Sequence, residues 1–259
     1  MTTLYPPFNR PTIILSSPWD VGEYRSLAHE IHKDRTGDLE HPDTIGLFAW
    51  ERATKDDPFD DRLPAQQQIP SPQDPLCAGT MAIFGEWIGR PLPANWDTSP
   101  VDGLGVQDEG QRFRLVHPWE EGAEANGGFP LTGSTFEVLT ALAASKAKGL
   151  SAPPLLILFV GPSSSADEPD ATAADWGNRT LRNQILRDYR KDRPEMTRRL
   201  DIVDTHLQRL LNFNRYIDEV LGRVSKFVET KEAAEQHIRL FFDKVMPHKV
   251  VSTIFLTLS

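Results

Sequence analysis

The chain contains very little cysteine: Cys77 is the single one among 259 residues. One thiol cannot form an internal disulfide, and such sparse use of cysteine is typical of proteins from a reducing compartment. Cys77 stands in an apolar run, which favours a small buried side chain over a catalytic thiol. The sequence therefore predicts a buried Cys77 and a chain without an internal disulfide.

Long apolar runs and an excess of basic charge are also missing. The longest apolar run, PPLLILFVG at 153–161, is far shorter than the roughly 20 residues of a membrane-spanning helix. The N-terminus has no basic segment followed by an apolar one, so we expect no signal peptide and a cytoplasmic location. With 28 basic against 37 acidic residues the net charge is −9, which argues against duplex nucleic acid as the main partner. We expect neither nucleic acid nor a membrane as a partner.

Several site signatures are absent as well. The sequence has no G-x-x-x-x-G-K-[ST] phosphate loop, no G-x-S-x-G nucleophile elbow and no H-E-x-x-H zinc motif. His29 and His32 are spaced to share a helix face, with His41 nearby, but we interpret these histidines as solvated rather than as ligands. We predict no metal site.

What the chain does contain is a series of apolar runs typical of buried strands. They lie at Thr12–Ser16, Thr44–Trp50, Ala78–Phe84 and Leu155–Val160. A helix is expected from about Val21 to Lys33, and VSKFV near residue 226 alternates like one more strand. Near-continuous apolar strands separated by helical segments predict an α/β fold with a mostly parallel sheet of four or five strands, flanking helices and a C-terminal helical extension.

Composition divides the chain into four parts. We expect an α/β core over 11–160 that carries a long loop at 94–130, then a flexible connection over 161–194 rich in Ser, Ala and Asp. Helices and a last strand over 195–246 complete the domain, and 247–259 is a tail beyond which we expect the native polypeptide to continue. A loop as long as 94–130 more often covers or binds a ligand than fills space.

A heptad pattern of apolar residues precedes the last strand. Two interpretations stay open for it: a long helix packed on its own domain, or a self-association helix in which the one polar position, Asn214, fixes the register. A last helix is expected over Lys231–Val245 with Thr230 as its cap. The positions of the heptad pattern are Met196, Leu200, Val203, Leu207, Leu210, Asn214, Ile217 and Leu221.

The first candidate site segment is the end of the first strand. Ser16 and Ser17 follow four apolar residues, and a helix begins soon after Trp19 and Asp20. At such a junction free backbone N–H groups point to the carboxyl edge of the sheet, where small serines leave room for a ligand. Asp20 is a suitable N-cap. The alternative is a plain strand-to-helix junction without a ligand.

The second segment is GSTFEVLTALAASKAKG, residues 133–149. Gly133 with Ser134 or Thr135 resembles a helix start, which places Glu137 in the first turn. Such a carboxylate can act as a nucleophile, or stabilise an oxocarbenium-like transition state, when an N-glycosidic bond breaks. The alternative is a residue that only favours the helix N-terminus.

The third segment follows the third strand. Gly85 ends the apolar run, and Trp87, Gly89 and Arg90 come next. Trp87 could stack on a base and Arg90 could hold a phosphate. The alternative is that Trp87 packs the loop and Arg90 is solvated.

These segments, in this order, resemble a known family. SSPWDV, PSPQDPLCAGTMAIFGEWIGRPLP and GSTFEVLTAL are similar to the motifs of a TIR-like domain of unknown function found at the N-termini of NACHT- and STAND-type, NLR-like NTPases. GRVSKFVETKEAAEQHIRLFFDKV resembles the family's last strand and helix, so the resemblance spans most of 11–246. The sequence departs from the family at Trp19, where a glycine is usual, and at Arg90, which follows the glycine instead of preceding it.

The resemblance implies a Rossmann-like, flavodoxin-like fold related to nucleoside deoxyribosyltransferases, whose G-T/S-x-x-E motif carries the catalytic Glu. That role would fall on Glu137, with NAD or a related nucleotide as substrate, no separate cofactor, and self-association or a STAND/NACHT NTPase module as partner in a defence system. A catalytically silent interaction module is the alternative. The substrate-binding residues so implied are Ser16, Ser17, Trp19, Asp20, Gly85, Trp87, Arg90 and Ser134.

Overall fold

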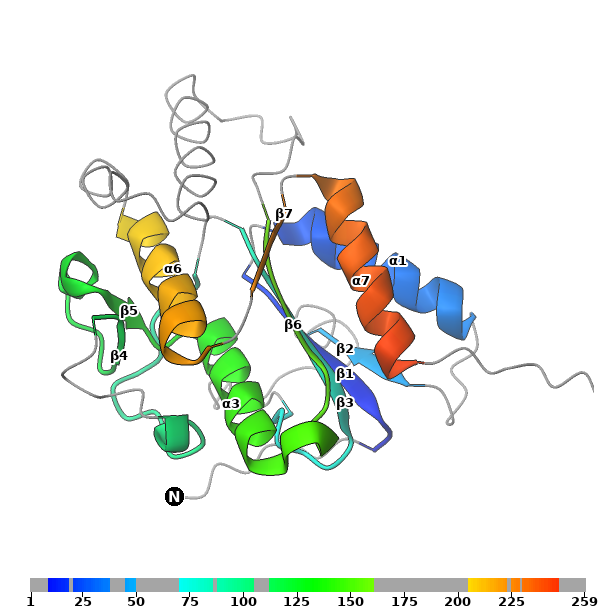
Figure 1. Ribbon diagram of the computed structural model, residues 1–259, viewed down its shortest axis with the longest axis horizontal. Coiled ribbons are helices and arrows are strands. Elements are labelled where there is room, and N and C mark those ends of the chain that lie inside the picture. The colour runs from blue at the N-terminus through cyan, green and yellow to red at the C-terminus, as the bar shows by residue number, and fades with distance from the viewer. Residues whose placement is uncertain are drawn as a thin grey trace, which may run out of the picture.

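Five parallel strands form the main sheet of the protein (Figure 1). The structure is a computed structural model that describes residues 9–18, 21–37, 45–49, 70–85, 88–104, 112–160, 205–222, 225–228 and 230–246. The strand order β2-β1-β3-β6-β7 confirms the predicted α/β fold with a parallel sheet. The strands are β1 (Thr12–Ser16), β2 (Gly46–Phe48), β3 (Cys77–Phe84), β6 (Leu155–Val160) and β7 (Lys226–Val228).

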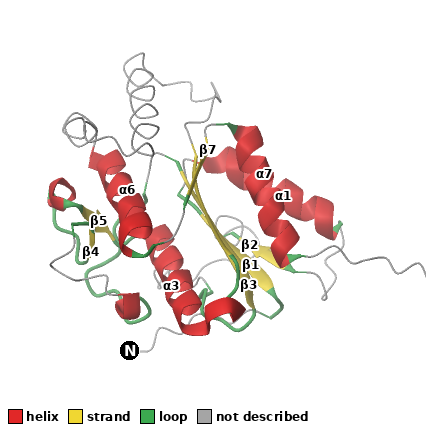
Figure 2. Cartoon of the chain, viewed as in Figure 1, coloured by secondary structure: helices red, strands yellow, loops and turns green. Residues whose placement is uncertain are grey.

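Helices cover both faces of this sheet (Figure 2). The first face carries α1 (Gly22–Thr36) and α7 (Lys231–Val245), and the second carries α3 (Gly133–Lys148) and α6 (Thr205–Arg215). An ion pair of 2.7 Å between Arg35 and Asp243 joins α1 to α7. Among the described residues, no helix is both long and apolar enough to cross a membrane.

The two faces have separate apolar cores because side chains alternate along each strand. In β1, Ile13 and Leu15 face α1 and α7, together with Met81 and Ile83 of β3. Phe84 of β3 faces α3 and α6 and stacks on Phe159 of β6 with ring centroids 5.4 Å apart. Parallel strands buried on both faces need the continuous apolar runs that predicted them.

Several element bounds follow closely from local sequence signals. The bounds of β1 and β6 are those predicted, and the strand predicted at Thr44–Trp50 is shorter, at Gly46–Phe48. Thr230 caps α7, because its side chain accepts a hydrogen bond from the backbone N–H of Ala233 at 3.2 Å. The expectation that His32 is solvated is wrong, since it is half-buried and its Nε2 lies 2.8 Å from the carbonyl oxygen of Ile45.

The stretch predicted as the loop at 94–130 contains structure of its own. Strands β4 (Arg114–Val116) and β5 (Gly128–Pro130) form a second, two-stranded parallel sheet, and a 3₁₀ helix covers Ala123–Asn126. Trp96 and Phe129 of this stretch are buried in the core beside α3 and α6. Its described part therefore packs on the second face of the main sheet instead of lying on the surface as a plain loop.

The heptad pattern belongs to the domain's own core over its described part. Leu207, Leu210 and Ile217 are buried against the second face of the sheet. Asn214 accepts a hydrogen bond of 2.6 Å from the hydroxyl of Ser225, just before β7. This polar position therefore links α6 to the last strand, which supports the interpretation of a helix packed on its own domain. Met196, Leu200 and Val203 lie outside the described residues.

Candidate functional site

The strand order reverses next to β1, and this places the candidate site. β1 pairs with β2 on one side and with β3 on the other, although all three strands run in the same direction. In open α/β sheets, the carboxyl ends of two strands that diverge in this way form the usual ligand position. Here these ends are Ser16 of β1 and Phe84 of β3, which is followed by the buried Gly85.

Ser16 points toward the second face of the sheet, because its neighbour Leu15 faces α1 and α7. Ser16 is 1% exposed, and its Oγ has no hydrogen-bond partner in the part of the chain that the structure describes. A buried polar atom without a partner costs free energy, and such atoms are rare in native proteins. Within the described chain, the end of β1 thus carries one unsatisfied polar group toward α3.

Ser17, also buried, is fixed by a residue that the sequence analysis did not single out. Arg25 of α1 donates from Nη1 to the carbonyl oxygen of Pro18 at 2.7 Å and to the Ser17 Oγ at 3.3 Å. The turn after β1 therefore carries a guanidinium group beside its serine. Trp19 and Asp20 lie outside the described residues, and the prediction that Asp20 caps the helix is wrong, since Val21 occupies the N-cap of α1.

Glu137 lies deeper in α3 than predicted, as the fifth residue of the helix. The N-cap is Thr132, whose Oγ1 accepts a 3.2 Å hydrogen bond from the backbone N–H of Thr135, while the Thr135 hydroxyl accepts a 2.7 Å bond from the N–H of Thr132. This reciprocal capping box starts the helix at Gly133. The first turn of α3 contains no acidic residue, so the expectation that Glu137 stands there is wrong.

Glu137 belongs to a buried stripe of α3 that differs from the apolar one. At 100° per residue, Gly133, Glu137, Thr140 and Ala144 share one side of the helix, and all four are buried. Glu137 is 7% exposed, and the fully buried Thr140 Oγ1 has no hydrogen-bond partner among the described residues. We call these four residues the Glu137 stripe. α3 packs against β1, β3 and β6, so this stripe and Ser16 lie on the same side of the sheet.

The segment after β3 is attached to the start of α3. The Thr132 hydroxyl donates to the carbonyl oxygen of Ile88 at 2.8 Å, and the backbone N–H of Leu92 donates to the carbonyl oxygen of Leu131 at 2.8 Å. Arg90 lies between these contacts and is exposed, and Ser134 is half-buried. The structure thus brings Arg90 and Ser134 to the region where α3 begins. Gly85 directly follows β3, and Trp87 is outside the described residues.

Other reactive side chains lie away from this region or are unsuited to it. Cys77 is buried at the start of β3, at the opposite edge of the sheet, and burial raises the pKa of its thiol. Burial lowers the pKa of His117, whose Nε2 has no hydrogen-bond partner within the described chain. In that part of the chain, no three His, Cys, Asp or Glu side chains are grouped so as to hold a metal ion.

Sequence reasoning missed Arg25 and Thr140. Local patterns assign the charged Arg25 to the solvated face of its helix and Thr140 to a packing face of its helix. At the end of β1 the structure brings together the Ser16 and Ser17 hydroxyls and the Arg25 guanidinium group, and Glu137 is buried on α3, which packs on the same side of the sheet as Ser16. Comparisons of the chain with protein-family models, with curated proteins and with solved structures found no match. The candidate site is therefore argued from the residues of this chain alone.

Proposed function

We propose that the protein is a TIR-like effector domain that cleaves the N-glycosidic bond of NAD or a related nucleotide. The observation that carries this proposal is the buried carboxylate of Glu137 on the same side of the sheet as Ser16, where the strand order reverses next to β1. Cleavage of a glycosidic bond generates positive charge on the sugar, and a fixed carboxylate in a poorly solvated site stabilises that charge.

The remaining residues of the carboxyl edge suit a nucleotide. Arg25 and the exposed Arg90 supply positive charge for phosphate groups. The hydroxyl of Ser16, which has no hydrogen-bond partner among the described residues, would bond a polar group of the ligand. Water is the second reactant: the bond between the sugar's anomeric carbon and the nitrogen of the base breaks, and the base leaves with that electron pair. Water supplies the oxygen of the new C–O bond and gives up one proton to the solvent.

The experiment compares nicotinamide release from NAD by the wild type and by Glu137→Gln, with the domain clustered on an oligomeric scaffold. Gln keeps the shape and removes the charge, so we expect turnover to fall by about a hundredfold or more. Glu235→Gln is the matched control, because it makes the same chemical change on α7, across the sheet. Equal turnover by wild type and Glu137→Gln would place the chemistry elsewhere.

An interaction module without activity is the second candidate. The small exposure of Glu137, 7%, favours it, because a substrate must reach the carboxylate. A folded and clustered wild type that releases no base from NAD or from other nucleotides would support this second function and contradict the first.

A further inference from the structure

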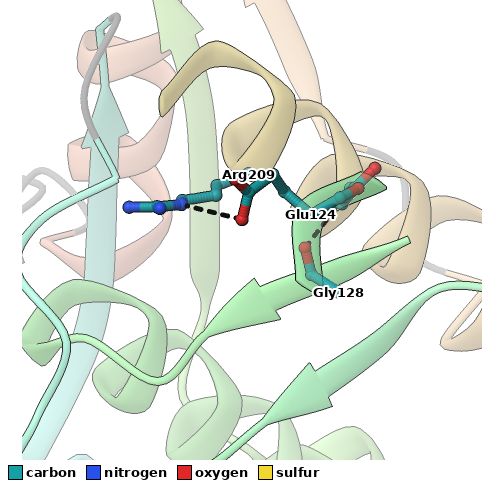
Figure 3. A network of polar contacts seen from close by, with 4 residues as sticks. Glu124, Gly128 and Arg209 are labelled. Atoms are coloured by element: carbon teal, nitrogen blue, oxygen red, sulfur yellow. Dashed lines mark hydrogen bonds and ion pairs between the residues drawn. The ribbon is translucent and has the colours of Figure 1, made fainter. Parts of the chain in front are cut away.

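A buried polar cluster fastens α6 to the second, smaller sheet. The side-chain Nδ2 of Asn212 donates two hydrogen bonds of 2.8 Å, one to the carbonyl oxygen of Glu124 and one to that of Gly128. Arg209, one turn earlier in α6, lies with its Nε 3.5 Å from the Glu124 carboxylate (Figure 3). We call these four residues the α6 clasp.

The clasp is shielded from water on both sides. Asn212 and Glu124 are each buried, and the guanidinium carbon of Arg209 lies over the ring of Trp119, 4.6 Å from its centroid. Both amide hydrogens of Asn212 are used, so no other donor of that side chain is left to replace a lost bond. Loss of Asn212 would leave two buried carbonyl oxygens without this donor, which is costly.

The chain leads from the clasp directly to the start of α3. Gly128 begins β5, which ends at Pro130, and the Pro130 carbonyl oxygen accepts a 3.2 Å hydrogen bond from the hydroxyl of Thr135. Thr135 is half of the capping box that starts α3, and Glu137 follows two residues later. Every link between α6 and Glu137 in this path is a hydrogen bond of 2.8 to 3.2 Å or a few residues of chain.

We infer that Asn212 is a positioning residue: by holding Gly128 and Glu124, it fixes the N-terminal turns of α3 and thereby the carboxylate of Glu137. The inference rests on the proposed function for its consequence in catalysis. Its structural part, the coupling of Asn212 to the α3 cap, has a test that needs no activity. Catalytic carboxylates lose rate when they are displaced by even a fraction of an ångström, so a positioning residue acts on turnover without touching substrate.

A second asparagine of α6 provides the matched control. Asn214 is buried like Asn212 and lies two residues further along the chain, but its side chain bonds Ser225 before β7 instead of the segment that leads to α3. Asn212→Leu and Asn214→Leu therefore make the same change in one helix and break contacts on two different sides. Local destabilisation of α6 is expected in both variants, and loosening of α3 only in the first.

Hydrogen exchange of backbone amides measures this coupling directly. The amides of Thr135 and Phe136 are bonded by the Thr132 cap, and those of Ala233 and Ala234 are bonded in the same way by the Thr230 cap of α7. We expect Asn212→Leu to speed exchange at the α3 cap by about tenfold relative to the α7 cap. In Asn214→Leu that ratio should stay within about twofold of the wild type.

An unchanged ratio in Asn212→Leu, or an equal change in both variants, would overturn the inference. If Asn212→Leu does not fold, Asn212→Ser removes the amide without adding bulk and is tested in its place. In an active wild type, the same Asn212 variant should lower kcat at least about tenfold with little change in KM. A wild type without any turnover contradicts the proposed function, whereas the exchange ratio still decides whether Asn212 holds the α3 cap.

Discussion

At the scale of single residues, Ser16 and Thr12 of β1 make a contrasting pair. Both are buried on the same side of the strand, but the Thr12 hydroxyl donates to the carbonyl oxygen of Arg10 at 2.9 Å, and Ser16 Oγ has no partner among the described residues. A hydroxyl that is buried without a bond destabilises the fold. Such a cost at a strand end is typical of a binding site, where the ligand provides the missing partner.

We therefore predict opposite effects of removing the two hydroxyls. Ser16→Ala should raise the free energy of unfolding by about 1 kcal/mol and weaken nucleotide binding, whereas Thr12→Val should lower the free energy of unfolding by about 1 kcal/mol. Urea unfolding of the two variants and the wild type checks this. A loss of stability in Ser16→Ala equal to that in Thr12→Val would show that the Ser16 hydroxyl is satisfied, for example by an ordered water.

Only some residues of the candidate site carry a signal in the sequence. Ser16, Ser17 and Glu137 are candidates from the sequence because strand ends and a G-S-x-x-E pattern are local signals. The turn of Glu137 was misjudged because Thr132 and Thr135 cap α3 with two threonines, where the usual capping box has Glu or Gln at the later position. The role of Asn212 could not be predicted from the sequence, because its hydrogen-bond partners lie 84 and 88 residues away along the chain.

At the scale of elements, two glycines bracket the 3₁₀ helix that contains Glu124. Gly122 and Gly127 both have positive φ, 84° and 78°. A Cβ on Gly122 would meet open space, but one on Gly127 would lie 1.9 Å from the carbonyl oxygen of Arg112. Backbone conformation alone therefore explains the first glycine, and close approach of two backbone segments explains the second.

These glycines give a prediction for the small sheet. Gly122→Ala should cost about 1 kcal/mol of unfolding free energy from backbone strain, and Gly127→Ala clearly more, because β5 must move away from Arg112 as well. Chemical denaturation of the two variants measures the difference. Equal costs would mean that the chain around Arg112 relaxes freely, which would also weaken the case for a rigid path to α3.

Elements of this second sheet were not predicted, for a physical reason. β4 and β5 have three residues each, shorter than the runs of four to eight residues by which strands are usually identified. They lie in a stretch rich in Gly, Asp and Glu, which local patterns assign to loops. Their burial comes from contacts with α6, so the tertiary structure decides their conformation. The apolar runs of β1 and β6, by contrast, are long enough to predict a buried strand without any knowledge of the tertiary structure.

At the scale of the whole molecule, the heptad pattern contributes to the core of a single chain. Leu207 is buried on α6 against the second face of the sheet. Leu207→Asp should therefore unfold the domain, because it places a charge in that core. Circular dichroism with light scattering checks this: we expect loss of folded signal. A folded variant with a lower mass than the wild type would instead support self-association through this face.

The parallel sheet also has a consequence for how the chain folds. β3 and β6 pair although their nearest ends are residues 84 and 155, and β6 and β7 pair across residues 160 and 226. Such long separations require large closed loops before the pairs can form, which slows folding. β1 and β2 close a much shorter loop, between residues 16 and 46, so this pair is the natural nucleus on which the later strands assemble. Until β6 arrives, one side of β3 exposes its backbone groups to any other chain that offers a strand.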